Sequence, residues 1–301
     1  MTGKVSNLQI KEDHKLKVLI ALLSVYFIWG STYLAIRIAL EGFPPFFMAG
    51  IRFLLVGIGL YLFLRLKGMP APDHIQWRGA AIIGGFLLLG GNGGVVFAEQ
   101  WVASGLAALG VATVPLWTVL FAGIWRRWPT RFEWLGLTLG FAGIVLLNME
   151  GDLRANPAGA IALIISAICW AFGSAWSRHL SLPSGLMASA VQMIAGGAFL
   201  LIASILIGER IEAFPAWRSI GAMFYLAVFG SLIGYSAYTY LINKVRPALA
   251  TSYAYVNPII AVALGVWLAG EEIGMMGIVA MLIIVTAVAL VAIGQKRISV
   301  K

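Results

Sequence analysis

The chain carries one arginine inside an otherwise uncharged apolar stretch. Arg52 lies seven residues after Pro45, in a run that has no other charged side chain until Arg65. Because a guanidinium group presents a planar fork of donors that matches a carboxylate, Arg52 could anchor the carboxylate of a bound molecule. Two structural interpretations stay open. Arg52 could pair with Glu41 or Glu99, or it could extend its charged end to the nearest aqueous boundary.

One carboxyl group and three amides also interrupt apolar stretches. Glu99 could sense a substrate amine or take up a proton, although its place at the end of a stretch favours a hydrated carboxylate. Asn92, Gln192 and Asn257 lie deeper, where each amide could bind a ligand or hydrogen-bond a neighbouring helix. Asn257 precedes Pro258, whose missing N–H frees a backbone carbonyl that this amide could satisfy.

Aromatic residues are frequent, with 11 Trp and 9 Tyr. Tyr235 and Tyr238 are three residues apart and would share a helix face. An interfacial belt of aromatic rings explains the tryptophans near loop junctions. It explains poorly those that lie nearer the middle of an apolar stretch, so these could line a cavity for an apolar or aromatic side chain. Trp29, Trp117 and Trp170 are candidates on this ground, and the other aromatic candidates are Trp101, Tyr235, Tyr238 and Tyr255.

The residues that metal, phosphate or hydrolytic chemistry needs are missing from the apolar stretches. All histidines and aspartates lie outside them, and the single cysteine, Cys169, sits among apolar neighbours. Neither an H-E-x-x-H zinc motif nor a G-x-x-x-x-G-K-[ST] phosphate loop occurs. We therefore expect no metal, no cofactor and no enzymatic activity. An integral-membrane enzyme acting on lipid or peptide is the alternative, but it lacks a nucleophile and a base at one depth.

The elements that position these residues follow from the composition. The chain is 61% hydrophobic and 11% charged, whereas soluble proteins are about half apolar and a quarter charged. A helix needs about 20 apolar residues to cross a bilayer. Although the net charge is +9, the basic residues form short clusters between apolar runs, which argues against a nucleic-acid partner. Ten stretches qualify as membrane spans: 18–37, 45–65, 79–98, 104–125, 132–149, 157–177, 185–207, 218–242, 247–269 and 274–294.

The loops between these spans predict the orientation of the chain. Of the 21 Lys and Arg residues, only Arg154, Arg210 and Arg218 fall in loops on one side, and Arg37 and Arg52 lie within spans. The remaining sixteen lie on the other side, which the positive-inside rule assigns to the cytoplasm. Both termini are therefore expected in the cytoplasm.

The two halves of the chain resemble each other at a spacing of about 143 residues. Val102–Ala107 is similar to Val245–Ala250, and a proline follows each segment at the same offset, Pro115 and Pro258. Five spans in each half would give the halves opposite orientations, as in many secondary transporters. We expect an all-α membrane protein of ten transmembrane helices, with inverted five-helix repeats at 18–149 and 157–294. Residues 1–17 and 295–301 would form cytoplasmic tails.

The residues that carry the repeat also resemble the EamA-type branch of the drug/metabolite transporter superfamily over almost the whole chain. That resemblance implies a central cavity surrounded by spans 3, 4, 8 and 9, with spans 5 and 10 at the periphery. One departure is that the first half has Trp125-Arg126-Arg127-Trp128-Pro129 where the family usually has a Gly-Glu-like pair. The matching motifs are Trp29-Gly30-Ser31-Thr32-Tyr33, Arg52-Phe53, Pro115, Trp170-Ala171-Phe172-Gly173-Ser174, Pro247-Ala248-Leu249-Ala250, Asn257-Pro258 and Gly270-Glu271.

The resemblance implies an exporter or facilitator of amino acids, including aromatic or other apolar ones, or of related metabolites. Such a protein would lie in the bacterial inner membrane, with the bilayer and a small-molecule substrate as partners, and a monomer would suffice. Because the spans hold no Asp, Glu or His at depth, we expect transport without obligate proton coupling. The candidate substrate-binding residues are Trp29, Ser31, Arg52, Asn92, Glu99, Trp101, Trp117, Trp170, Ser174, Gln192, Tyr235, Tyr238, Tyr255 and Asn257.

Overall fold

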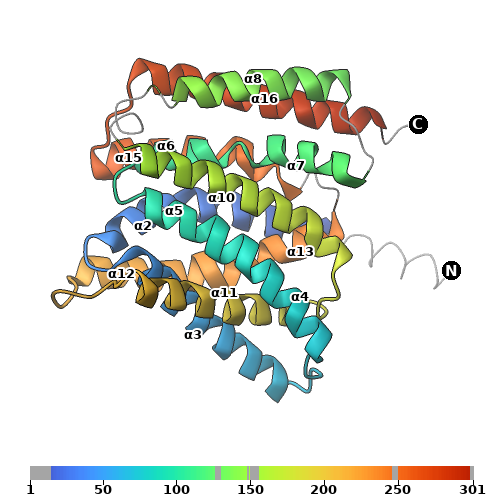
Figure 1. The fold of residues 1–301 in the computed structure, drawn as a ribbon, viewed down its shortest axis with the longest axis vertical. Helices are drawn as coiled ribbons and strands as arrows, with labels where there is room; N and C mark the ends of the chain where they lie inside the picture. The colour runs from blue at the N-terminus through green and yellow to red at the C-terminus, as the bar shows by residue number, and fades with distance from the viewer. Residues whose placement is uncertain (1–14, 126–129, 148, 150–155, 246–249, 299–301) are drawn as a thin grey trace.

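Helices make up all the regular structure of the described chain (Figure 1). The computed structural model describes residues 15–125, 130–147, 149, 156–245 and 250–298. The first half contains η1 (Val25–Trp29), α2 (Gly30–Leu40), α3 (Pro45–Leu66), α4 (His74–Gly84), η2 (Gly85–Asn92), α5 (Gly93–Ala98), α6 (Ser104–Val111), α7 (Val114–Ala122), η3 (Gly123–Trp125) and α8 (Arg131–Leu147). The second half contains α10 (Pro157–Trp176), η4 (Ser177–His179), α11 (Leu186–Leu206), α12 (Trp217–Tyr225), η5 (Leu226–Tyr235), α13 (Ser236–Lys244), α15 (Tyr253–Ala269) and α16 (Met275–Ile298).

Six of these helical runs are long and apolar enough to cross a bilayer, by length and composition. They are Lys15–Leu40, Pro45–Leu66, His74–Ala98, Pro157–His179, Leu186–Leu206 and Trp217–Lys244. The other four predicted spans contain shorter apolar helices, at Ser104–Thr118, Trp134–Gly143, Val256–Ala269 and Met275–Ala287. The chain is thus an all-α, multi-pass membrane protein, as the composition predicted.

The fourth predicted span is not one continuous helix. It divides into α6 and α7 between Val111 and Val114. Pro115 lies in the first turn of α7, where its missing N–H is tolerated, but it cannot continue the hydrogen bonding of α6. Pro258, by contrast, lies inside α15. The two prolines that the repeat aligns therefore have different local effects.

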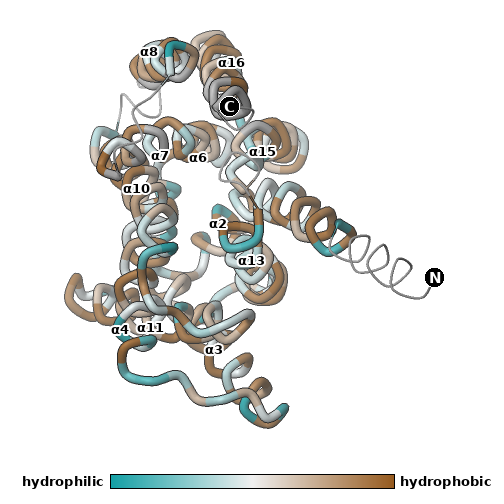
Figure 2. The backbone as a smooth tube through the Cα atoms, turned by 90° about the vertical axis from the view of Figure 1, so that its right-hand side faces the viewer, coloured by the Kyte–Doolittle hydropathy of each residue, from teal (hydrophilic) through white to brown (hydrophobic). Residues whose placement is uncertain are grey.

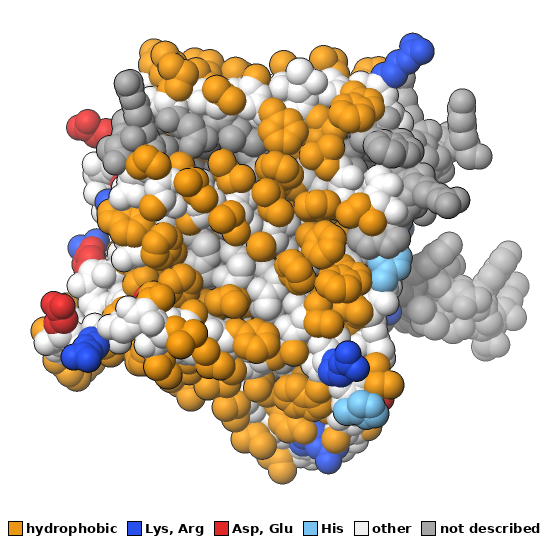
Figure 3. All heavy atoms as spheres, in the orientation of Figure 1, with side chains coloured by type: hydrophobic (Ala, Val, Ile, Leu, Met, Phe, Trp, Pro, Cys, Tyr) orange, Lys and Arg blue, Asp and Glu red, His pale blue; other side chains and the backbone are white. Residues whose placement is uncertain are grey.

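The surface facing the viewer in Figure 3 fits a lipid environment. Charged side chains gather toward its left and right margins, and hydrophobic side chains fill the band between them (Figure 3). Elsewhere Leu66, Leu206 and Trp267 are each at least 80% exposed. Water would make such exposure unfavourable, whereas hydrocarbon does not.

Helix packing follows the same pattern in both halves. The long helix α3 packs along α11, and α8 packs along α16 at the periphery of the bundle (Figures 1 and 2). In addition, α10 packs on η2, α5, α6 and α7, while α2 packs on α12 and α15. A shift of about 143 residues relates α2 to α10, α4 to α12 and α7 to α15, so the first span of each half packs on the third and fourth spans of the other half.

The third and eighth spans, which correspond at the spacing of about 143 residues, both contain a π-helical segment. The π-helical segment η2 lies within His74–Ala98, and the π-helical segment η5 lies within Trp217–Lys244. π-Helical turns are rare and occur frequently at functional sites. Both segments face the centre of the bundle, because each contributes residues to the cavity described below.

One end of the bundle carries the loops at 41–44, 99–103, 207–216 and 270–274 (left in Figure 1). We call this the Glu271 end. The opposite end carries the loops at 67–73 and 180–185 and the last helical residues of α16 (Figure 1). The described part of the chain also begins on that side, at residue 15, and ends there, at residue 298 (Figure 1).

Candidate functional site

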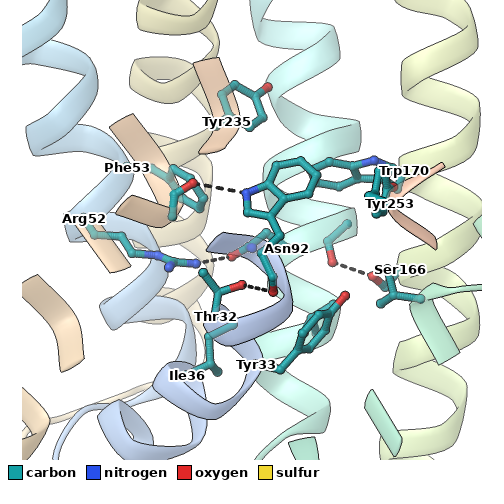
Figure 4. A pocket seen from close by; sticks show the side chains of 15 residues that line it. Thr32, Tyr33, Ile36, Arg52, Phe53, Asn92, Ser166, Trp170, Tyr235 and Tyr253 are labelled. Carbon is teal, nitrogen blue, oxygen red and sulfur yellow. Dashed lines mark hydrogen bonds between the residues drawn. The ribbon is translucent and has the colours of Figure 1, made fainter. Parts of the chain in front are cut away.

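A small cavity of about 60 Å³ lies at the centre of the bundle (Figure 4). A cavity needs about 10–15 Å³ to hold one water, and each water in the liquid occupies about 30 Å³, so the cavity has room for a few waters. Its wall combines one cation, one amide, hydroxyls and aromatic rings. The lining residues are Trp29, Thr32, Tyr33, Ile36, Arg52, Phe53, Gly91, Asn92, Val95, Val111, Ser166, Trp170, Gly230, Tyr235 and Tyr253.

Arg52 brings a buried positive charge to this cavity. Its side chain is 2% exposed, and its Nη2 donates to Oδ1 of Asn92 at 2.7 Å (Figure 4). The guanidinium carbon lies 4.6 Å from the centre of the Phe53 ring. Among the described residues, Nε of Arg52 has no hydrogen-bond partner and no carboxylate forms a salt bridge with it. The guanidinium therefore retains donors that a ligand carboxylate could use.

Of the structural interpretations proposed for Arg52 from the sequence, only an electrostatic interaction with Glu99 is observed. Glu41 pairs with Arg218 instead, at 3.8 Å, and both side chains of that pair are largely exposed. A side chain that is 2% exposed has not extended its charge to a water boundary. Glu99 lies close enough to Arg52 to act on it electrostatically, but no hydrogen bond joins them in the described chain.

Four aromatic rings form a contiguous group beside the cavity, which we call the aromatic cluster: Trp29, Trp170, Tyr238 and Tyr253. The Trp29 ring lies 5.3, 5.0 and 5.4 Å from the rings of Trp170, Tyr238 and Tyr253, measured between centroids. Nε1 of Trp170 donates to the Tyr238 hydroxyl at 3.0 Å, and Nε1 of Trp29 donates to the Gly230 carbonyl at 3.3 Å. The cluster thus offers flat apolar faces, and the polar edges of Trp29, Trp170 and Tyr238 are already paired.

The aromatic cluster and the Glu271 end lie on opposite sides of the cavity. Ile36 lines the cavity four residues before the end of α2 at Leu40. Trp29 is seven residues earlier, about 10 Å further from that end at the helical rise. Tyr238 lies still further along its run, near the end of α13 at Lys244.

Tyr235, which lines the cavity, forms a hydrogen-bonded pair with Gln192, which does not. The Tyr235 hydroxyl donates to Oε1 of Gln192 at 2.7 Å, and the Tyr235 ring packs edge-on to Phe53. Gln192 is fully buried, does not line the cavity, and leaves its Nε2 without a partner in the described chain. The amide predicted as a binding residue therefore positions Tyr235.

At the Glu271 end a carboxylate binds the N-terminus of a helix. Glu271 accepts hydrogen bonds from the backbone N–H of Ser104 at 2.9 Å, the Ser104 hydroxyl at 2.8 Å and the backbone N–H of Gly105 at 3.3 Å. Arg37 donates to the Val102 carbonyl at 2.9 Å and approaches Glu271 to 4.0 Å. We call these contacts the Glu271 latch. Gly270 makes the turn possible, since its φ of 65° lies in the left-handed region.

Glu99 contradicts the expectation of a hydrated carboxylate. It directly follows the last residue of α5 and is 1% exposed, with neither carboxyl oxygen hydrogen-bonded in the described chain. The chain after it turns back into α6 at Ser104 and covers it. Burial raises the pKa of the Glu99 carboxyl well above its usual range, and the nearby Glu271 acts in the same direction. Arg37 and Arg52 lower this pKa, but by less than burial raises it.

The other predicted site residues lie outside the cavity wall. The Ser31 hydroxyl bonds the Tyr225 hydroxyl at 2.6 Å, and the Ser174 hydroxyl bonds that of Tyr238 at 2.7 Å. Trp101 is 41% exposed and packs on Phe97.

Two of the remaining predicted residues support helix packing. Trp117 packs edge-on to Phe141. With its amide oriented to suit its neighbours, Asn257 donates to the carbonyls of Tyr26 and Tyr253, at 3.0 and 3.3 Å. The carbonyl that Pro258 frees is that of Ala254, so this contact joins α15 to the first span and leaves the helix-break role a prediction. Tyr255 lies on α15, and its side chain is outside the described residues.

The sequence did not single out several lining residues. Thr32, Tyr33 and Ile36 follow Trp29 by three, four and seven residues, and this helical spacing was the available signal. The expectation that spans 3, 4, 8 and 9 surround the cavity is only partly met. The first span supplies four lining residues, whereas the fourth supplies Val111 and the ninth supplies Tyr253. The break between α6 and α7 coincides with this reduced contribution of the fourth span.

Within the described residues, no group of three or more His, Cys, Asp or Glu side chains could hold a metal ion. The polar groups of the cavity are instead hydrogen-bond donors and acceptors for an organic ligand, with one fixed cation. Such a wall suits reversible binding of a small molecule that carries a carboxylate and an apolar part.

Comparison with known proteins agrees with this architecture. The chain matches the model of the EamA-like transporter family twice, over residues 16–149 and 157–293, which indicates duplicated halves. It is 49% identical to the uncharacterized inner membrane transporter YedA of Escherichia coli K12 over 276 residues, covering 91% of this chain and 90% of YedA. It is 27% identical to the protein PecM of Dickeya dadantii, covering 79% of this chain and 80% of PecM.

A crystal structure with 19% sequence identity has the same fold, with a TM-score of 0.67 over 92% of this chain and 97% of the other. The resemblance drawn from the sequence motifs is thus confirmed, as is a location in the inner membrane. The chain belongs to the EamA-like transporter family and is a multi-pass inner-membrane transporter, not an enzyme.

Proposed function

We propose that this transporter moves amino acids with aromatic or other apolar side chains, or similar small carboxylates, across the inner membrane by alternating access. The gradient of a metabolite made in the cell favours outward transport. The observation that carries the proposal is Arg52, a buried guanidinium without a carboxylate partner in the described chain, in a cavity walled by aromatic rings.

The substrate would bind with its carboxylate at Arg52 and its side chain against the aromatic cluster. A carboxylate can accept two parallel hydrogen bonds from one guanidinium, which fixes its orientation. Rings stacked edge-on or offset against an aromatic side chain contribute about 0.5–1.5 kcal/mol per pair beyond buried area. Asn92, already bonded to Arg52, would hold the guanidinium in place between substrate molecules.

The architecture that supports alternating access is a pair of inverted five-helix repeats with both termini in the cytoplasm. The equivalent packing of the two halves and the paired π-helical segments support it. Under this orientation the Glu271 end faces outward. The cavity, with room for a few waters, is smaller than an amino acid needs, so its walls must move apart at one end or the other to admit substrate.

Counterflow in proteoliposomes tests the substrate class. We expect purified protein, loaded with unlabelled L-phenylalanine, to take up labelled L-phenylalanine, and other apolar amino acids to compete. Phenethylamine, which has the ring and the amine but no carboxylate, should not compete. Equal competition by phenethylamine would refute the role of Arg52 as a carboxylate anchor.

Variants of two arginines sharpen this test. Arg52→Gln removes the cation at the cavity and should reduce counterflow at least tenfold, since hydrogen bonds to charged groups contribute about 1.5–3 kcal/mol. The matched control is Arg218→Gln, because Arg218 is exposed and pairs with the exposed Glu41. Similar losses in both variants would show that insertion or stability, not binding, is measured.

Thiol labelling tests the orientation separately. A single cysteine introduced at Glu272, in a chain where Cys169 is replaced by serine, should react with an impermeant reagent added to intact cells. A cysteine at Lys244 should react only after permeabilisation. The reverse pattern would refute the proposed orientation of the repeats.

A further inference from the structure

Glu99 is a buried carboxyl group that the proposed binding mode does not use. Its side chain is 1% exposed and neither oxygen has a hydrogen-bond partner in the described chain. Glu209 and Glu271, by comparison, both accept backbone hydrogen bonds at helix N-termini. An ionised carboxylate is costly to bury without such partners, so the neutral, protonated form is favoured at Glu99.

The position of Glu99 connects it to the cavity. Asn92 and Val95 line the cavity, and Glu99 follows them by seven and four residues on the same run. This spacing places the three side chains along one helix face that leads from the cavity toward the Glu271 end. Glu99 therefore lies between the cavity and the Glu271 latch, one helical turn beyond the wall.

The charges that act on Glu99 come from separate elements. Arg37 lies on α2 with Tyr33, Arg52 lies on α3, and Glu271 follows α15. Two of these groups are cationic, Glu271 is anionic, and Tyr33 is neutral. Opening of the Glu271 end would separate these elements and admit water to Glu99, which would then lose its proton to solution.

Arg52 links the state of Glu99 to the substrate. An ionised Glu99 and a substrate carboxylate would share the positive charge of one guanidinium, so each weakens the attraction of the other. Protonation of Glu99 removes this competition, and a bound carboxylate in turn favours the proton on Glu99. Substrate and proton therefore bind together more strongly than either binds alone.

On the basis of the proposed function, we propose that Glu99 is a proton-binding site and that one proton crosses the membrane with each substrate molecule. The proton comes from water on the side where substrate enters and returns to water on the side where it leaves. Apart from this proton, the protein exchanges no atom with the substrate or with water. This replaces the expectation from the sequence that transport proceeds without proton coupling.

Infrared spectroscopy tests the proton on Glu99 without any substrate. The reconstituted protein at neutral pH should show the C=O stretching band of a protonated carboxylic acid, and Glu99→Gln should remove it. The matched control is Glu272→Gln, in which an exposed carboxylate at the same end is replaced and the band should remain. Absence of the band from the unmodified protein, or its persistence in Glu99→Gln, would overturn the proposal.

Transport measurements test the coupling. In proteoliposomes with acid outside, the unmodified protein should accumulate L-phenylalanine above equilibrium, and Glu99→Gln should only equilibrate it. Counterflow needs no gradient, so it should persist in Glu99→Gln and shows whether the proposed function holds. Counterflow without gradient-driven accumulation in the unmodified protein would refute proton coupling alone. Loss of counterflow in Glu99→Gln for L-phenylalanine but not for phenylpropionate would instead assign Glu99 to the substrate ammonium and overturn the proton role.

Discussion

Replacement of Glu271 by glutamine should release the closed end of the transporter. The carboxylate accepts two hydrogen bonds from Ser104 and one from Gly105 at the start of α6. Glutamine keeps one acceptor oxygen and loses the negative charge, so we expect one or two of these bonds to be lost. The ion pair with Arg37 is long at 4.0 Å and adds little, because the Arg37 side chain is 40% exposed.

The size of the effect follows from these contacts. A hydrogen bond to a charged group contributes about 1.5–3 kcal/mol. Loss of one such bond from the closed state alone would raise the ratio of open to closed molecules about 10- to 150-fold. The conversion is that about 1.4 kcal/mol corresponds to a factor of ten in an equilibrium constant. The upper value requires that water fully satisfies Glu271 when the end is open.

The assay is the rate at which an impermeant thiol reagent reaches the cavity. Ile36, which lines the cavity on the side of the Glu271 end, is replaced by cysteine in a background where Cys169 is serine. Glu271→Gln should accelerate labelling of Cys at this position within the range given above. Glu272→Gln serves as the control, since Glu272 is exposed and adjacent. Unchanged labelling in Glu271→Gln, or equal acceleration in both variants, would refute the latch.

Two further predictions concern packing and stability. Gly234→Ala would place a methyl group 2.5 Å from Nε1 of Trp29. We therefore expect weaker transport and a free energy of unfolding lower by about 1–3 kcal/mol. Gly221→Ala, which meets open space, should have neither effect; equal effects would contradict the close approach of Trp29. Glu209→Gln should lower the melting temperature in detergent, because Glu209 accepts both first-turn N–H bonds of α3 and such caps contribute about 0.5–2 kcal/mol. An equal decrease in Glu212→Gln, an exposed position, would contradict that role.

The sequence predicted the membrane helices well because hydropathy and length are local properties. It identified Arg52 for a related reason, since a charge inside an apolar run is conspicuous without any knowledge of the fold. The break between α6 and α7 was harder to predict. Pro115 occupies a position equivalent to Pro258, and only the tertiary setting decides which helix tolerates its proline.

The aromatic residues show where sequence reasoning ends. Trp101 and Trp170 were both candidates for the cavity wall, yet Trp101 is 41% exposed and Trp170 is 8% exposed. Burial depends on which helices meet, and hydropathy does not record that. Glu99 was misjudged for the same reason, because its position at the end of a span says nothing of the loop that covers it.

The Gly270-Glu271 motif has a role that only the fold explains. Glu271 binds residues 167 positions earlier in the chain, at the N-terminus of α6. Its equivalent in the first half, about 143 residues earlier, is Trp128, a residue outside the described part of the structure and without a carboxylate. A tryptophan side chain cannot accept hydrogen bonds at a helix N-terminus.

In the proposed inverted repeat, this difference makes the two ends of the transporter energetically unequal. Two equivalent latches would stabilise the outward-closed and inward-closed states to a similar extent. With a carboxylate at residue 271 and a tryptophan at the equivalent residue 128, the outward-closed state gains about 1.5–3 kcal/mol for each charge-assisted hydrogen bond that Glu271 makes. The substrate must then offset this difference when it passes outward, and the proton on Glu99 assists because it removes the competing charge beside Arg52. We therefore expect the resting transporter to be closed on the outside, with substrate from the cell as the ligand that shifts it.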